Sequence, residues 1–343
     1  MYNETLAFRK RAYEDEQRTA NWYETKRMLP DWKETRPSLK LVHSQVLQNV
    51  TQRVDLAFQA FFRRVREGAE EPGFPRFKQF GRYDSMTYPQ YDSGVRLEGK
   101  RLLLSKVGAV LVVLHRPLEG TPKTLTLSRS GTGKWFACFS CETDAHPLPP
   151  TSEVVGVDVG LASFATFSDG EKIENPRFYR KDEADLKRVQ RRKDAAKAKQ
   201  DWQENAKQKL LLAKIGERIA NRRADFAHKR SRELVDRYQV IVFEDLAPQQ
   251  MGARKGRGMR KSIMDVAWTQ CIEMTVSKAA EAGRRVILVD PRNTSKMCSR
   301  CSKLVEKKLS DRTHTCPACG LVMDRDTNAA INILQRGLQT LSP

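Results

Sequence analysis

The sequence of 343 residues is long enough for two or three domains with a sizeable hydrophobic core. Its 62 Lys and Arg outnumber 42 Asp and Glu, and the net charge of +20 favours a polyanionic partner such as nucleic acid. The sequence contains no run of about 18 apolar residues, which excludes a membrane-spanning helix. The N-terminus is charged throughout, unlike a signal peptide.

Residues 1–72 are predicted to be helical. In the segment SQVLQNVTQRVDLAFQAFFRRV, apolar residues recur at three- and four-residue steps and form one stripe, which consists of Val46, Val50, Val54, Phe58, Phe61 and Val65. Because Phe58, Phe61 and Phe62 lie on or beside this stripe, we expect them to be core residues rather than base-stacking ones.

Residues 73–150 are predicted to form a small β-rich module. GFPRFK begins it with a turn and a basic aromatic patch that contains Arg76 and Lys78. Short strand-like runs follow, separated by Gly and Pro: RLLL, AVLVVL, KTLTLSRS and KWFACFS. Cys138 and Cys141 lie three residues apart on the last run, so their side chains point to opposite faces and form neither a metal site nor a redox pair.

Residues 151–291 are predicted to form an α/β domain with a mixed sheet. Its strands are the runs VVGVDVG, SFATFSDG, YQVIVFEDL and RRVILVD. Residues 182–238 are predicted to form a charged helical hairpin, which is either a solvated surface element or a basic arm along a nucleic-acid backbone. The Gly/Arg/Lys-rich loop GARKGRGMRK contributes Arg254, Lys255 and Arg257 as candidate nucleic-acid contacts.

Residues 292–321 have the pattern of a zinc ribbon. Two CxxC pairs, with 14 residues between them, consist of Cys298, Cys301, Cys316 and Cys319. Two such knuckles can wrap around one tetrahedral Zn²⁺ as thiolates. His314 is an alternative ligand, although four thiolates are already present. A site with all four positions filled contributes folding energy and not hydrolysis.

Three acids form the second candidate site. Asp158 lies near the end of the valine- and glycine-rich strand VVGVDV, where an unpaired buried carboxylate is costly. Glu244 ends the strand VIVFE, and Asp326 lies at the start of a final helix. Acids at strand ends can converge, and their oxygens suit two Mg²⁺ or Mn²⁺ ions. Taken alone, each acid fits a cap or surface ion pair equally well, and alternation lets either Glu244 or Asp245 face the site.

The motifs GVDVG, FEDL and TSxxCSxC…TCPACGxxxDRDTNAAINI, in this order, resemble the TnpB proteins of insertion sequences, which are relatives of type V CRISPR nucleases. The resemblance implies an RNase H-like (RuvC-type) nuclease domain that continues at residues 322–343 after the zinc-ribbon insertion. It also implies a helical recognition domain and a β-barrel wedge domain.

The same resemblance implies an RNA-guided DNA endonuclease that hydrolyses phosphodiester bonds. Its partners would be a guide RNA from the element's own end and double-stranded DNA with an adjacent motif. The implied catalytic residues are Asp158, Glu244 and Asp326, with Asp324 less favoured and Asn328 near the metals. We expect a monomeric, cytoplasmic, nucleoid-associated prokaryotic protein.

Two departures from the family pattern stand out. A strand usually precedes the pair that is here Tyr2-Asn3, so we expect either that the wedge lacks an edge strand or that the start codon is miscalled. Ser302 follows the first knuckle where glycine is common. The alternatives are a compact type V CRISPR effector, a nuclease-inactive guide-dependent regulator, which the intact acids argue against, and a strand-joining transposase.

Overall fold

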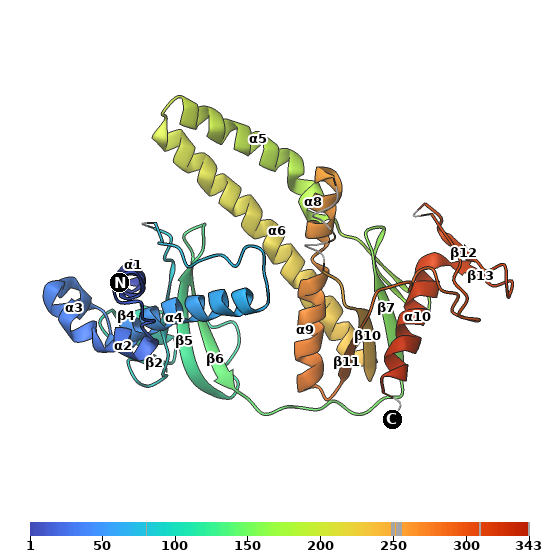
Figure 1. The fold of residues 1–343 in the computed structure, drawn as a ribbon, viewed down its shortest axis with the longest axis horizontal. Coiled ribbons are helices and arrows are strands. Elements are labelled where there is room, and N and C mark those ends of the chain that lie inside the picture. The colour runs from blue at the N-terminus through green and yellow to red at the C-terminus, as the bar shows by residue number, and fades with distance from the viewer. Residues whose placement is uncertain (80, 248–250, 252–255, 309, 342–343) are drawn as a thin grey trace. The chain divides into compact units, whose positions relative to one another are not determined.

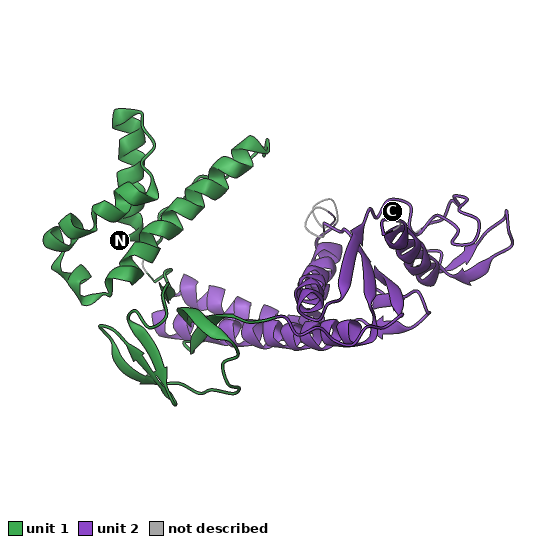
Figure 2. Ribbon diagram, turned by 90° about the horizontal axis from the view of Figure 1, so that it is seen from below, with its two compact units in different colours: residues 1–144 green, residues 145–343 purple. Residues whose placement is uncertain are grey.

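The computed structural model describes residues 1–79, 81–247, 251, 256–308 and 310–341. The chain divides into two compact units, residues 1–144 and 145–343 (Figure 2). The predicted domain boundaries stay predictions. Within the described residues, no helix is both long enough and apolar enough to cross a membrane.

The first unit begins with helices (Figure 1). They are α1 (Tyr2–Glu16), α2 (Trp22–Arg27), α3 (Leu29–Thr35), the 3₁₀ helix η1 (Pro37–Leu41) and α4 (Ser44–Arg66). Helix α4 buries the predicted stripe from Val46 to Phe58. The prediction that Phe62 is a core residue is wrong, because its side chain is 43% exposed, and Val65 is 47% exposed. The last two turns of α4 therefore lie outside the core.

Two separate antiparallel sheets follow in the first unit. One has the order β1-β5-β6 and the other β2-β3-β4. Their bounds are β1 (Ser85–Tyr88), β2 (Val95–Glu98), β3 (Arg101–Leu104), β4 (Gly108–Leu111), β5 (Thr121–Arg129) and β6 (Trp135–Glu142). The described strands do not close a barrel, because the four-residue strands β2, β3 and β4 pair only with one another. The predicted closed barrel is therefore not found.

A five-stranded mixed sheet forms the centre of the second unit. Its order is β11-β10-β7-β8-β9, and its strands are β7 (Val154–Val159), β8 (Ser163–Phe167), β9 (Lys172–Glu174), β10 (Val240–Glu244) and β11 (Arg285–Val289). Strand β10 is parallel to β7 and β11, whereas β8 and β9 run antiparallel to their neighbours. The four predicted strands are confirmed. Strand β9 has only three residues, KIE, and was not predicted.

Helices cover both faces of this sheet (Figure 1). Ile241 and Phe243 pack into a core with α9 (Trp268–Glu281) and α6 (Trp202–Arg237). Val242 packs on the other face against Ile333 of α10 (Arg325–Gln339). Alternation along β10 therefore places Val242 and Glu244 on the face that α10 covers.

Helices α5 (Phe178–Ala198) and α6 form the predicted hairpin, with its turn at residues 199–201. Asn205 donates to the carbonyl oxygen of Lys193 near the turn, and Arg218 pairs with Asp182 at 2.5 Å farther along the helices. These contacts fix the antiparallel pairing. Helix α8 (Arg257–Val266) lies beside the hairpin base, where its Asp265 accepts from the backbone N–H of Tyr179 at 2.9 Å.

Candidate carboxylate and zinc sites

Asp158 and Glu244 lie on adjacent strands and on the same face of the sheet. In the parallel register of β7 and β10, Gly156 is opposite Val242 and Val157 is opposite Phe243. The next step of this register places Asp158 beside Glu244, on strands about 4.8 Å apart. Asp245 points to the opposite face and is exposed. The backbone register thus decides between Glu244 and Asp245, which alternation alone left open.

Helix α10 approaches both strands closely. A Cβ on Gly156 would lie 2.1 Å from the carbonyl oxygen of Ala330, and one on Gly337 would lie 2.5 Å from Val242. These two glycines let the helix backbone lie against the sheet, as close approach requires. The contact holds the N-terminal end of α10, with Asp326 in its first turn, on the same face as Asp158 and Glu244.

The charge at this site is unbalanced. Burial raises the pKa of Asp158 well above its usual value, and the nearby carboxylates of Glu244 and Asp326 raise it further. The Arg325 guanidinium opposes the shift only in part. Burial also raises the pKa of Glu244, although Thr294 donates a 2.5 Å hydrogen bond to its Oε1. A divalent cation would compensate these charges, and an all-oxygen donor set suits Mg²⁺ or Mn²⁺.

Asp326 carries its own basic partners. Its carboxylate pairs with Arg325 at 2.8 Å and with Arg312 at 3.8 Å. The ligand oxygens of Asp158, Glu244 and Asp326 do not all lie within 4.8 Å of one another. Among the described residues only the four cysteines meet that distance. The three acids therefore lie on one face of the sheet, where burial, Glu244 and Asp326 all raise the pKa of Asp158. Arg325 and Arg312 hold the Asp326 carboxylate in its present position.

Asp324 has a different role from Asp326. It is the N-cap of α10, and its Oδ1 accepts from the backbone N–H groups of Asp326 and Thr327, each at 3.0 Å. Its other oxygen pairs with Lys172 of β9 at 2.8 Å. Although burial opposes it, these contacts lower the pKa of Asp324. Asp324 thus caps the helix, and its charge raises the pKa of Asp158 less than that of Asp326 does, which favours Asp326 as the member of the acid group.

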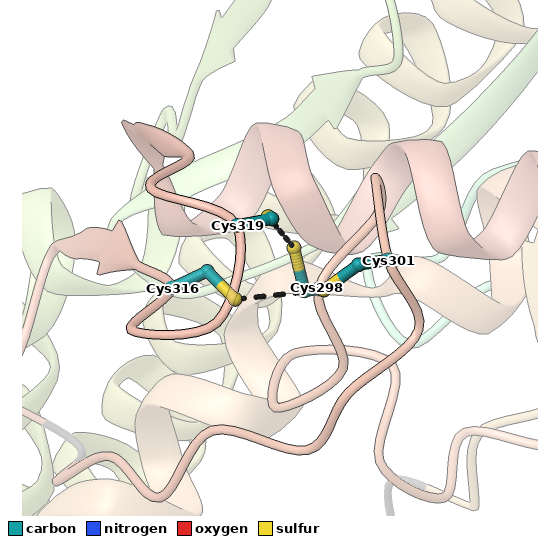
Figure 3. A group of neighbouring side chains, drawn as sticks. All are labelled: Cys298, Cys301, Cys316 and Cys319. Atoms are coloured by element: carbon teal, nitrogen blue, oxygen red, sulfur yellow. Dashed lines mark hydrogen bonds between the residues drawn. The ribbon is translucent and has the colours of Figure 1, made fainter.

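The four predicted cysteines converge in the second unit (Figure 3). The Sγ atoms of Cys298 and Cys319 are 3.6 Å apart, as are those of Cys301 and Cys316. Four thiolates about 2.3 Å from a tetrahedral Zn²⁺ would be about 3.8 Å apart, so the cluster fits zinc. His314 is fully buried outside this group, with its Nδ1 against Lys307.

Each knuckle turns back on itself through a backbone hydrogen bond. Ser302 donates to the carbonyl oxygen of Cys298 and Gly320 donates to that of Cys316, each at 2.9 Å. Ser302 has φ +60° and Gly320 has φ +73°. Both positions are left-handed, a conformation that glycine adopts without cost and serine does not. The unusual Ser302 therefore occupies a strained position.

Two buried asparagines fasten the ribbon segment to the sheet domain, and one of them, Asn332, was not predicted. Asn332 donates to the carbonyl oxygens of Thr294 and Met297, at 2.8 and 2.7 Å. Asn328 donates to the carbonyl oxygen of Met297 and accepts from the N–H of Ser299, and its place near the metals stays a prediction. Both asparagines are fully buried, and their spacing of four residues on an otherwise apolar helix face was the available signal.

The predicted nucleic-acid residues belong to both units of the chain. Arg76 is exposed on the segment after α4, and Arg257 is exposed at the start of α8. The Nζ atom of Lys78 lies 4.6 Å from the ring centroid of Tyr2 and 4.7 Å from that of Tyr83. Arg254 and Lys255 lie outside the described residues.

Comparisons with known protein families match two parts of the chain. The OrfB_IS605 family, described as "Probable transposase", matches residues 137–254. The "Cas12f1-like, TNB domain" matches residues 268–333, which include α9, the four cysteines and most of α10.

Curated relatives match nearly the whole chain. A Streptomyces pristinaespiralis protein named "Putative RNA-guided DNA endonuclease" is 36% identical, covering 98% of this chain and 83% of that protein. The Escherichia coli K12 protein "Putative RNA-guided DNA endonuclease InsQ" is 32% identical, covering 92% and 80%. "TnpB-like protein L79" of Acanthamoeba polyphaga mimivirus is 27% identical, covering 65% and 45%.

The fold is similar to that of a solved protein. The cryo-EM structure of a Cas12f1–sgRNA–target DNA complex matches with a TM-score of 0.55 at 15% identity, covering 97% of this chain and 79% of that one. The two relatives that match nearly the whole chain and the two family matches indicate the same protein family, and the fold is consistent with it. The chain belongs to the TnpB family.

Proposed function

We propose that this protein is an RNA-guided DNA endonuclease whose nuclease site consists of Asp158, Glu244 and Asp326. The observation that carries the proposal is the placement of the half-buried Asp158 on the same face of the sheet as Glu244 and Asp326, where burial and then the charges of these two acids raise the pKa of the Asp158 carboxyl. Carboxylates 86 and 168 positions away in the sequence thus act on Asp158 electrostatically, and acids perturbed in this way cluster at functional sites.

The three acids would hold two Mg²⁺ or Mn²⁺ ions. When bound, two such ions can activate a water molecule and stabilise the leaving oxygen of a phosphodiester. The protein's own part is to fix the donor oxygens. Thr294 orients the Glu244 carboxylate, the β7–β10 register sets the first two acids side by side, and α10 presents Asp326. The strand order, with three antiparallel strands followed by two parallel ones, supports an RNase H-like (RuvC-type) domain.

The proposed nucleic-acid partners are a guide RNA and a matching DNA duplex with an adjacent motif. The names of the curated relatives and the sgRNA and target DNA in the Cas12f1 complex support this assignment. Base pairing would supply sequence specificity, while the net charge of +20 would hold the backbones. Arg76, Lys78 and Arg257 are the proposed contacts, together with Arg254 and Lys255, and the protein would act as a monomer.

The cysteine cluster would hold one structural Zn²⁺. With all four positions taken by thiolates, this ion has no open site for substrate. Its effect on the nuclease site would be indirect. The ribbon backbone is anchored to α10 through Asn328 and Asn332, and Arg312 from the same segment pairs with Asp326.

The test is cleavage of a guide-matched plasmid by protein purified together with the RNA from its native flanking DNA. Asp158→Ala and Glu244→Gln should abolish cutting and leave RNA binding intact. Asp245→Asn is the matched control, because Asp245 adjoins Glu244 but lies exposed on the other face. Cutting by the Glu244→Gln variant at the wild-type rate, or its loss in Asp245→Asn, would refute the site.

A further inference from the structure

The first unit contains a cavity of about 420 Å³ that the proposed function leaves without a role. It lies where α1 and the end of α4 meet the segment that follows α4. Aromatic rings form most of its wall, from Tyr13, Phe58, Phe61, Phe62 and Phe74. A concave, mainly apolar site of this size is typical of ligand pockets.

Polar contacts hold these rings in place. Arg64 at the end of α4 donates to the carbonyl oxygens of Pro72 and Gly73, at 2.5 and 3.0 Å. Gly73 has φ +65°, and the turn places the Phe74 ring edge-on to Phe58 and Phe61, with centroids 5.5 and 5.2 Å away. The aromatic wall is therefore built by the fold and not by chance exposure.

A buried arginine forms the floor. The guanidinium of Arg9 lies 4.3 Å from the centroid of the Phe58 ring, and Asp55 pairs with it at 2.6 Å. Only 6% of Arg9 is exposed. Asp55 balances the charge of Arg9, and the guanidinium holds the Phe58 ring in place at the cavity.

The mouth of the cavity remains open and apolar. Tyr13 is 59% exposed, Phe62 43% and Phe74 45%. Clustered exposed aromatics mark an interaction site, whereas scattered ones need no explanation. The last turn of α4, next to the phenylalanines, carries Arg63 and Arg66, which do not line the cavity themselves. Lys10 and Glu14 also line the cavity and pair at 4.0 Å.

We propose that this cavity binds an unpaired nucleobase, with the base against the phenylalanine rings and the neighbouring phosphates near the basic end of α4. Flat π-faces stack on aromatic side chains irrespective of sequence. A second copy of the chain is the competing occupant. A net charge of +20 opposes self-association and attracts a polyanion, so charge complementarity favours nucleic acid.

The proposal rests on the proposed nucleic-acid function but is tested without cleavage. The probes are a fluorescent single-stranded dT12 oligonucleotide and the same backbone with abasic sites, which keeps the phosphates and removes the bases. We expect the full-length wild-type protein to bind dT12 about fivefold to a hundredfold more tightly than the abasic strand. Phe62→Ala should remove most of this difference without changing affinity for the abasic strand.

Two further variants keep the test decisive. Leu56→Ala is the matched control, since Leu56 is 53% exposed on the same helix and does not line the cavity, and it should keep the full preference. Phe62→Trp should restore stacking. An unchanged base preference in Phe62→Ala would overturn the proposal. So would a wild-type dimer that this substitution dissociates, because the cavity would then be a subunit interface. If the wild-type protein prefers dT12 over the abasic strand but does not cut the guide-matched plasmid, that result would count against the proposed nuclease function and not against the base-binding cavity.

Discussion

Replacing Gly156 with alanine tests whether helix α10 sets the nuclease geometry. The new Cβ would lie 2.1 Å from the carbonyl oxygen of Ala330 and 2.7 Å from the N–H nitrogen of Leu334. Both are backbone atoms, so no side chain can rotate away. Ordinary contact begins near 3.4 Å, and the helix must therefore move by about 1.3 Å or the strand must yield.

The expected cost follows from this displacement. Overpacking of a well-packed contact destabilises a protein by about 1–3 kcal/mol, and a clash with backbone on both elements belongs at the upper end, about 3 kcal/mol. Because α10 carries Asp326, the same shift should separate it from Asp158. A misplacement of about 1 Å commonly costs on the order of 100-fold in rate.

The assay combines urea unfolding, zinc content and cleavage of a guide-matched plasmid. Gly156→Ala should unfold at lower urea and cut about 100-fold more slowly while it retains zinc. Gly216→Ala is the control, because Gly216 is exposed on α6 with open space around its Cβ position. That variant should gain about 0.5–1 kcal/mol and cut normally. A Gly156→Ala protein with wild-type stability and rate would refute the close approach of α10.

Three other predictions follow from individual residues. Because the pKa of Asp158 is raised on folding, the folded protein without metal takes up a proton, so its stability should fall as pH rises from about 4 through the raised pKa. Asp158→Asn should flatten this loss and abolish the rise in Tm that Mg²⁺ causes; a steep pH dependence that persists in the variant would contradict the assignment. Cys316→Ser should release zinc, measured by mass spectrometry, whereas Cys138→Ser on β6 should not; equal zinc content in both would exclude the four-thiolate site. Ser302→Gly should raise stability by about 1 kcal/mol because it relieves a left-handed serine, and an unchanged unfolding midpoint would count against strain there.

The sequence predicts the strands of the second unit well, because each is a short run of β-branched and aromatic residues. Strand β9 lacks such a run, since Lys172 and Glu174 flank a single Ile173. The cysteine spacing likewise predicts the cluster that the fold forms. These signals are local, and local patterns are what a single sequence carries.

The remaining features depend on tertiary contacts. Alternation could not decide between Glu244 and Asp245, whereas the pairing of β10 with β7 does. The apolar periodicity of α4 continues from Phe58 to Phe62, but the residues that pack over the helix do not extend as far. The same sequence pattern therefore gives a buried Phe58 and an exposed Phe62. The prediction of a closed barrel was wrong because the sequence of a single strand does not specify which distant strand it pairs with.

We infer that Asp158, Glu244 and Asp326 jointly hold divalent ions. The most direct measurement is anomalous diffraction from crystals of the protein soaked in Mn²⁺. Mn²⁺ peaks should lie about 2.0–2.3 Å from carboxylate oxygens of all three residues, with Asp326 released from Arg325. Peaks elsewhere, or ions that bind without Asp326, in a protein that still cuts guide-matched DNA would contradict this inference.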